Sequence, residues 1–262
     1  MNRLFSSFLV LGFTLVGWSQ PTKDSFKEAS YSQDGKSLNY RILYPENFNK
    51  NKQYPVVLFL HGAGERGSDN KKQLVHGSSL FLSDSFREKY PAVVVFPQCP
   101  KESYWANVDV DRSSFPLTFN FKNGGEPTYA MKLVMGLMDS VKSLSYSQDD
   151  RLYLGGLSMG GFGTYELLSR RPDMFAAAFA ICGGAHTATA SVYASLVPMW
   201  VFHGGKDNVV LPSYSTEMVI ALRNAGGSVK YTLYKDANHN SWDSAFAEPG
   251  LMDWLFSHKN SN

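Results

Sequence analysis

Continuous apolar segments alternate with segments of helical periodicity along most of the chain. Six short runs rich in β-branched, alanine or aromatic residues end in glycine or a polar residue: 54–62, 90–98, 150–158, 175–184, 198–207 and 229–239. Between and after them, hydrophobic residues recur at helical spacing over 127–144, 161–170, 213–227 and 251–258. Strands without apolar–polar alternation are buried on both faces, as in a parallel sheet covered by helices. The pattern predicts a doubly wound α/β fold, mostly parallel, with helices on both faces of the sheet.

Two segments depart from this pattern. Residues 26–45 alternate apolar and polar positions around Asp34-Gly35, which predicts an N-terminal antiparallel hairpin with a tight turn. Residues 103–127 form the longest stretch with no clear period. Long loops in compact domains are often functional, so we expect this stretch to be a loop that forms a wall of a pocket.

The first residues have a different character from the rest of the chain. A basic residue, Arg3, precedes an apolar run over 4–16, and small and polar residues follow. This run of about 13 residues is shorter than the ~20 that span a bilayer, so we predict a signal peptide over 1–19 and one domain over 20–262. No cysteine follows the run to accept a lipid. We therefore expect a periplasmic or secreted protein without a membrane span after signal removal.

Composition and charge exclude several classes of function. The 262 residues are 44% hydrophobic and carry a formal net charge of +2, without a charged block or a repeat. Such weak and dispersed basicity argues against nucleic-acid binding. The clustered ligand spacings of a zinc site are absent from the sequence, and we expect neither a metal nor an organic cofactor.

The chain has two cysteines, Cys99 and Cys182, which follow two different predicted strands. In the strand order usual for this fold, two other strands lie between them. Three inter-strand steps make roughly 14 Å, which exceeds the roughly 7 Å limit for a disulfide. We predict two free, buried thiols.

A serine flanked by glycines is the strongest chemical signal. Gly156-Leu157-Ser158-Met159-Gly160 is a G-x-S-x-G motif between a predicted strand and a predicted helix. In this context the serine sits on a sharp turn, where side chains at the flanking positions would collide with neighbouring backbone. The motif predicts Ser158 as a nucleophile, with the amide of Met159 at the place where an oxyanion forms.

A serine nucleophile needs a histidine base and an acid that orients it, in the chain order Ser, Asp/Glu, His. Asp207 and His239 follow the ends of two predicted strands, where an open α/β sheet places its site. Asp236 is a rival acid, but it lies only three residues before His239 in the same loop. His203 lies inside the strand that precedes Asp207, so we expect core packing for it. We predict the triad Ser158, Asp207 and His239.

The remaining site residues are predicted from loops. His61-Gly62-Ala63-Gly64 follow a buried strand, and we assign the second oxyanion donor to the amide of Ala63, or else Gly62. We expect His61 to brace this loop. Trp105, in the long loop, and Trp242, three residues past His239, are candidates for stacking on substrate, with core packing as the alternative. Arg66 is a candidate substrate contact or a partner of Glu65 in an ion pair that holds the loop.

Together these motifs resemble a known family. "LHGAGERG", "FPQCP" followed by a tryptophan, "GLSMGGFGTYELLSRRPDMFAAAFAICGG", "FHGGKDNVV" and "HNSWDSAFAEPGLMDWL" resemble secreted single-domain esterases of the alpha/beta-hydrolase family, over about residues 38–256. They are similar to feruloyl and acetyl xylan esterases of carbohydrate esterase family one. The resemblance implies the same triad, Ser158, Asp207 and His239.

The sequence thus predicts a serine esterase that acts through an acyl-enzyme. The resemblance implies acetyl or feruloyl esters, with acylated plant polysaccharide as the expected partner. A general short-chain carboxylesterase and a polyester-active hydrolase are alternatives. Because fold does not fix function, a non-catalytic carbohydrate-binding protein on the same scaffold is a further alternative.

Overall fold

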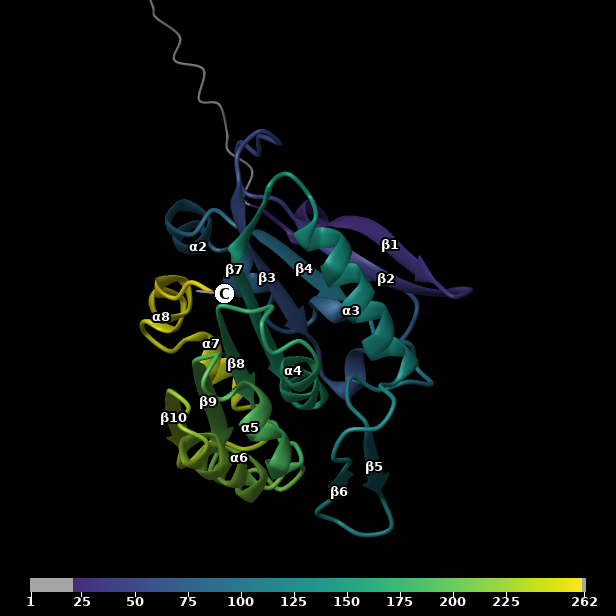
Figure 1. Ribbon diagram of the computed structural model, residues 1–262, viewed down its shortest axis with the longest axis vertical. Helices are drawn as coiled ribbons and strands as arrows, with labels where there is room; N and C mark the ends of the chain where they lie inside the picture. Colours follow the sequence, from purple (N-terminus) through teal and green to yellow (C-terminus); the bar gives the residue numbers. More distant parts are fainter. Residues whose placement is uncertain (1–20, 261–262) are drawn as a thin grey trace, which may run out of the picture.

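An eight-stranded sheet forms the centre of the computed structural model, which describes residues 21–260 (Figure 1). The signal peptide predicted over 1–19 lies outside the described residues. The strand order is β1-β2-β4-β3-β7-β8-β9-β10. β2 is antiparallel to β1 and to β4, and every other pair in this sheet is parallel. The strands are β1 (Lys27–Gln33), β2 (Lys36–Leu43), β3 (Tyr54–Leu60), β4 (Val93–Pro97), β7 (Ser147–Leu157), β8 (Ala177–Ile181), β9 (Met199–Gly204) and β10 (Val229–Tyr234).

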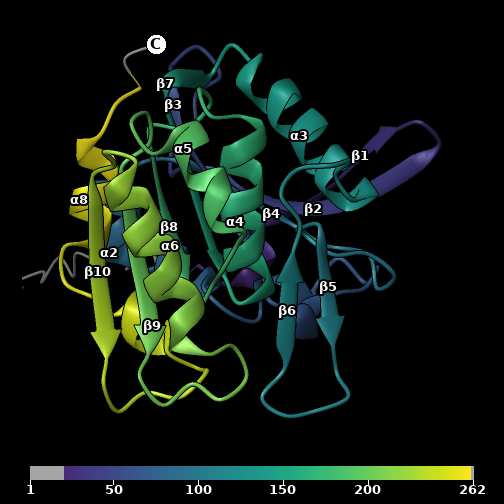
Figure 2. The same ribbon diagram turned by 60° about the horizontal axis from the view of Figure 1, so that its bottom comes forward.

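Helices cover both faces of the sheet, as predicted. One face packs against α3 (Tyr129–Lys142), α4 (Met159–Arg170), α5 (Ala190–Tyr193) and α6 (Pro212–Asn224) (Figure 2). The other packs against α1 (Ser78–Leu82), α2 (Asp84–Lys89), α7 (Trp242–Phe246) and α8 (Leu251–Ser257). Side chains within β3 alternate between the two cores: Val56 and Leu58 join the first, and Val57 and Phe59 join the second. Burial on both faces explains why this strand has no polar positions.

The N-terminal hairpin is confirmed. β1 and β2 pair in register from Lys27 with Ile42 to Gln33 with Lys36. The two turn residues have positive φ, 53° at Asp34 and 72° at Gly35. This turn geometry favours Asp-Gly, which explains the sequence at the tip.

The prediction of an irregular loop over 103–127 is wrong in its middle part. β5 (Val108–Asp111) and β6 (Thr118–Phe121) pair there as a separate antiparallel hairpin, which lies apart from the main sheet at the lower right of Figure 1. Each strand has only four residues, too few for a recognisable period. Phe119 of β6 packs edge-on against Phe162 of α4, with ring centroids 5.0 Å apart. The hairpin is thereby anchored beside the helix that follows Ser158.

The cysteine prediction is confirmed. β3 and β7 separate β4, which precedes Cys99, from β8, which precedes Cys182. Both thiols are buried and free. No helix within residues 21–260 has the length and apolar character needed to cross a membrane.

Candidate active site

The turn around Ser158 joins β7 to α4 in a strained conformation. Ser158 has φ 53° and ψ −118°, which L-residues rarely adopt. A Cβ on Gly156 would lie 2.2 Å from the carbonyl oxygen of Gly160, and a Cβ on Gly160 would lie 1.9 Å from that of Leu60. The glycines of the motif therefore leave room for the close approach of β3, β7 and α4. The turn places Ser158 at the end of its strand, on the wall of a pocket.

The structure brings the three residues of the predicted triad together. Ser158 Oγ lies 3.0 Å from His239 Nε2, and His239 Nδ1 lies 2.7 Å from Asp207 Oδ2. These residues follow β7, β10 and β9, whose carboxyl ends lie at one edge of the sheet (Figure 1). The rival acid Asp236 points away: its carboxylate is 2.6 Å from Lys206 Nζ, and its side chain is 90% exposed.

Asp207 is held by donors on both carboxylate oxygens. Oδ1 accepts from the amides of Val209 at 2.9 Å and Val210 at 3.0 Å. Burial alone would raise the pKa of this carboxyl, but hydrogen bonds from His203, His239 and the Val209 amide outweigh that effect. The net result is a pKa well below the usual range. Asp207 is therefore a carboxylate that can hold His239 in one tautomer.

His203, for which the sequence predicts only core packing, is a neighbour of the site. It is fully buried, as expected, but its Nε2 also lies 3.2 Å from Asp207 Oδ2. The same nitrogen lies 2.8 Å from the Val210 carbonyl, so it faces two acceptors and carries a hydrogen. His203 Nδ1 lies 2.7 Å from Ser215 Oγ, which fixes the ring from the other side. The sequence has no signal for this contact, because His203 lies in β9 and Asp207 follows the turn after it, where a spacing of four residues fixes no direction.

The loop predicted to supply the second oxyanion donor lies beside the nucleophile. A Cβ on Gly62 would lie 3.7 Å from Ser158 Cβ, and both Gly62 and Ala63 line the pocket. α4 begins at Met159, so its free amide end lies at Ser158. The assignment of the donors to Met159 and Ala63 stays a prediction.

His61 links this loop to the end of β4. Its Nε2 accepts from the Cys99 amide at 2.9 Å, so Nδ1 carries the hydrogen and donates to the Gly62 carbonyl at 2.6 Å. Burial lowers the pKa of His61 to about 4. The ring is therefore neutral at physiological pH and braces the loop.

The predicted substrate contacts have different outcomes. Trp242 lines the pocket, with its ring centroid 5.3 Å from that of His239. The prediction that Trp105 lines the pocket is wrong: its side chain is fully buried, and its Nε1 donates to the His61 carbonyl. Arg66 is also outside the pocket lining. Its guanidinium donates to the carbonyls of Ala63, Lys101 and Ser103, so it holds the loop through backbone oxygens rather than through an ion pair with Glu65.

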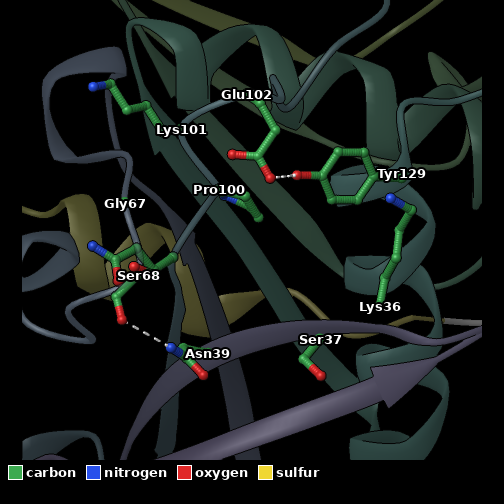
Figure 3. Close-up of a pocket in the computed structure, with 10 residues that line it drawn as sticks. Lys36, Ser37, Asn39, Gly67, Ser68, Pro100, Lys101, Glu102 and Tyr129 are labelled. Atoms are coloured by element: carbon green, nitrogen blue, oxygen red, sulfur yellow. Dashed lines mark hydrogen bonds between the residues drawn. The ribbon is translucent and has the colours of Figure 1, made fainter.

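The pocket at Ser158 has a volume of about 310 Å³. The segment 103–127 contributes Tyr104, Arg112, Leu117 and Phe119 to its lining, so the expected pocket wall is confirmed. A larger hollow of about 440 Å³ has a different lining, which includes Gly67 and Ser68 (Figure 3). It is lined by Lys36, Glu102 and Tyr129 among others, and it contains no serine–histidine pair.

One group of side chains has the composition of a metal site. Ligand atoms of Cys182, Asp207 and His239 lie within 4.8 Å of one another. His239 Nδ1 and Asp207 Oδ2 already bond to each other, however. Burial, followed by the charge of Asp207, raises the pKa of the Cys182 thiol, and a thiol must lose its proton to bind a metal. Two members of this group are therefore engaged with each other in the triad, and Cys182 is their protonated neighbour. The absence of a metal stays a prediction.

The fold and this serine–histidine–aspartate arrangement define a serine hydrolase with the alpha/beta-hydrolase fold. The family model described as "Putative esterase" matches residues 32–242. The chain belongs to this esterase family.

Named relatives agree with this class. The chain is 27% identical over 192 residues to lysophospholipase-like protein 1 of Mus musculus, covering 70% of this chain and 79% of the relative. It is 26% identical over 178 residues to the bifunctional acetylxylan esterase/xylanase XynS20E of Neocallimastix patriciarum, covering 68% of this chain and 22% of that protein.

Solved structures are similar over almost the whole chain. A thermostable esterase has a TM-score of 0.80 and 31% identity over 90% of this chain, which spans 64% of that esterase. A ferulic acid esterase from Anaeromyces mucronatus, solved with ferulic acid, has a TM-score of 0.66 and 16% identity over 94% of this chain and 93% of its own. The second likeness shows the fold alone.

Proposed function

We propose that the protein is a secreted serine esterase that hydrolyses carboxylic esters through an acyl-enzyme, acting on acetyl or feruloyl esters of plant polysaccharide. The observation that carries this proposal is the row of hydrogen bonds from Ser158 through His239 to Asp207 at the wall of a pocket. Such a row is the arrangement that activates a serine hydroxyl.

In the first step, His239 Nε2 takes the proton of Ser158 Oγ, which attacks the ester carbonyl. The amides of Met159 and Ala63 hold the oxyanion, and Asp207 stabilises the imidazolium. His239 then gives its proton to the leaving alcohol. Water, activated by the same imidazole, releases the acid from Ser158. The short 2.7 Å contact between His239 Nδ1 and Asp207 Oδ2 supports this division of roles.

The substrate class is supported by the pocket and by the relatives. A volume of about 310 Å³ is at the small end of ligand pockets, and Leu117, Phe119 and Phe162 give it an apolar side for an acyl group. Two relatives of this chain are named "Bifunctional acetylxylan esterase/xylanase XynS20E" and "Probable feruloyl esterase C". Secretion is supported by the signal-like residues 1–19 of the sequence.

The test is ester hydrolysis by the mature protein beside Ser158→Ala. The substrates are p-nitrophenyl esters of increasing chain length, methyl ferulate and acetylated xylan. We expect kcat to fall by about 10⁴-fold or more in Ser158→Ala, since the variant lacks the nucleophile. A preference for short p-nitrophenyl esters alone would instead indicate a general carboxylesterase. A native protein that hydrolyses none of them and resists fluorophosphonate labelling would indicate a binding protein.

A further inference from the structure

The elements that line the pocket differ in the polarity of the side chains they contribute. The hairpin, α4 and the loop after Asp207 contribute five apolar side chains, Leu117, Phe119, Phe162, Val209 and Val210, and one cation, Arg112 of the hairpin. Glu65, His76 and Trp242 line the same pocket from the segment that follows β3 and from the start of α7. An ester has an acyl part and an alcohol part, so this difference can fix which part lies on which side.

The position of His239 decides the direction. In the mechanism proposed above, His239 returns its proton to the leaving alcohol, whose oxygen must therefore lie next to this ring. Trp242 packs edge-on against His239, with ring centroids 5.3 Å apart. The ring centroids of His76 and Trp242 lie 5.1 Å apart, and His76 Nε2 is 3.9 Å from Glu65 Oε1. Trp242, His76 and Glu65 therefore form a row of neighbours that starts at the base.

Glu65 is the member of this row whose bonding is incomplete. Its side chain is only 13% exposed, yet none of residues 21–260 donates a hydrogen bond to its carboxylate. His76 Nε2, at 3.9 Å, is too far away for a hydrogen bond. The Glu65 oxygens are not among the buried polar atoms without a partner, so they face the water of the pocket. A bound ligand that displaces this water must replace its hydrogen bonds, and hydroxyl groups would do so.

We propose that Glu65, His76 and Trp242 form the binding site for the leaving alcohol, and that this alcohol is a sugar ring with neighbouring free hydroxyls. The Glu65 carboxylate accepts from the hydroxyls, the His76 ring bonds to a further oxygen, and the indole of Trp242 packs against the ring face. The inference rests on the proposed function, since it needs the ester to be cleaved at Ser158.

The larger hollow is a poorer candidate for the same ligand. Its acid, Glu102, already accepts a hydrogen bond from Tyr129 at 2.5 Å (Figure 3). Lys36 Nζ covers the Tyr129 ring at 4.3 Å from the centroid, so this face is closed to stacking. Glu102 is therefore a suitable control position, because it is an acid in a neighbouring hollow outside the pocket of Ser158.

The test compares three esters that form the same acetyl-enzyme: acetylated xylo-oligosaccharide, p-nitrophenyl acetate and acetylcholine. Because water releases the same acetyl group in each case, differences in kcat/KM report the step in which the alcohol leaves. We expect Glu65→Gln to lower the ratio of kcat/KM for the sugar ester to that for p-nitrophenyl acetate at least tenfold. The replacement keeps the shape of the side chain and removes its charge. His76→Asn should lower the same ratio, and Glu102→Gln should leave it within twofold.

Several outcomes would overturn the proposal. An unchanged ratio in Glu65→Gln, including an equal loss on all three esters, would show that Glu65 supports the loop instead. A larger loss on acetylcholine than on the sugar ester would assign the site to a cationic alcohol. A shift of the ratio by Glu102→Gln alone would place the sugar in the larger hollow. Failure of the native protein to hydrolyse any of the three esters would count against the proposed function itself.

Discussion

Asp207 receives hydrogen bonds from two imidazoles on one oxygen and two amides on the other. His239 and His203 both reach Oδ2, at 2.7 and 3.2 Å, while Val209 and Val210 donate to Oδ1. Four donors leave the carboxylate a single orientation, aimed at the base. The acid can orient His239 only as an ionised acceptor, because a neutral amide in its place would allow the wrong tautomer.

The first prediction compares the two acids that the sequence offers. Asp207→Asn should lower kcat by about 10³ to 10⁴-fold at neutral pH, because the amide removes the anionic acceptor for His239 Nδ1. Asp236→Asn should leave kcat within about twofold of the native value, since this exposed side chain bonds to Lys206 and to no other side chain among residues 21–260. The measurement is kcat on p-nitrophenyl acetate for the purified variants. Comparable losses in both would contradict the assignment of the acid.

For single residues, the sequence predicted the positions of the triad but not the contacts of every residue around it. Ser158 could be identified because the glycines beside it are required by the local turn. Asp207 and His239 could be identified because the fold sets the order of the triad along the chain. Trp105 could not be placed, because the direction of its side chain depends on packing beneath the His61 carbonyl. Arg66 likewise binds carbonyls at Lys101 and Ser103, which are distant in sequence.

The turn between β7 and α4 is the element on which the site depends. Gly160 meets the backbone of Leu60, so β3 and α4 approach more closely than any side chain would allow. This contact also sets the distance between Ser158 and the loop of Gly62 and Ala63. Stability and activity are therefore coupled at this helix start.

The second prediction tests that coupling. Gly160→Ala should lower the free energy of unfolding by about 3 kcal/mol or more, because its Cβ would lie 1.9 Å from a backbone oxygen that cannot move aside. Gly64→Ala is the control, since no atom lies within 4 Å of a Cβ there. Urea unfolding measures both, and we expect Gly64→Ala to change the free energy of unfolding by less than about 1 kcal/mol. A Gly160→Ala protein as stable as the native one would show that β3 and α4 can separate.

The β5–β6 hairpin is an element that the sequence did not predict. Its strands have four residues each, and only Phe119 is buried in β6. Its stability comes from contacts with α4 and α6, where Phe119 packs on Phe162 and its amide donates to Tyr214 Oη. A short segment that depends on tertiary contacts leaves little periodic signal in the sequence.

In the molecule as a whole, the parallel strands collect the site from distant parts of the chain. β7, β9 and β10 end at one edge, so Ser158, Asp207 and His239 meet although 81 residues separate the first from the last. That arrangement was predictable because long apolar strands and helices determine the topology. His61 adds a further link across the sheet, from the end of β3 to the end of β4.

The pH dependence of the free energy of unfolding should reflect the buried imidazole of His61. Burial lowers the pKa of His61 to about 4, whereas an unfolded histidine titrates near 6.5. Between these values the unfolded chain binds more protons than the folded one, so stability falls as the pH falls from about 6.5 to about 4. This lowering of the His61 pKa corresponds to roughly 3 kcal/mol of stability from this one group.

The third prediction is that His61→Gln flattens part of this dependence. Glutamine can accept from the Cys99 amide and donate to the Gly62 carbonyl, but it cannot take up a proton. We expect the native protein to lose about 3 kcal/mol more than the variant between pH 7 and pH 4, by urea unfolding at each pH. His258→Gln, which removes a partly exposed histidine near the C-terminus, should follow the native curve. If the native and His61→Gln curves run parallel, protonation of His61 does not open the loop that holds Gly62 against Ser158.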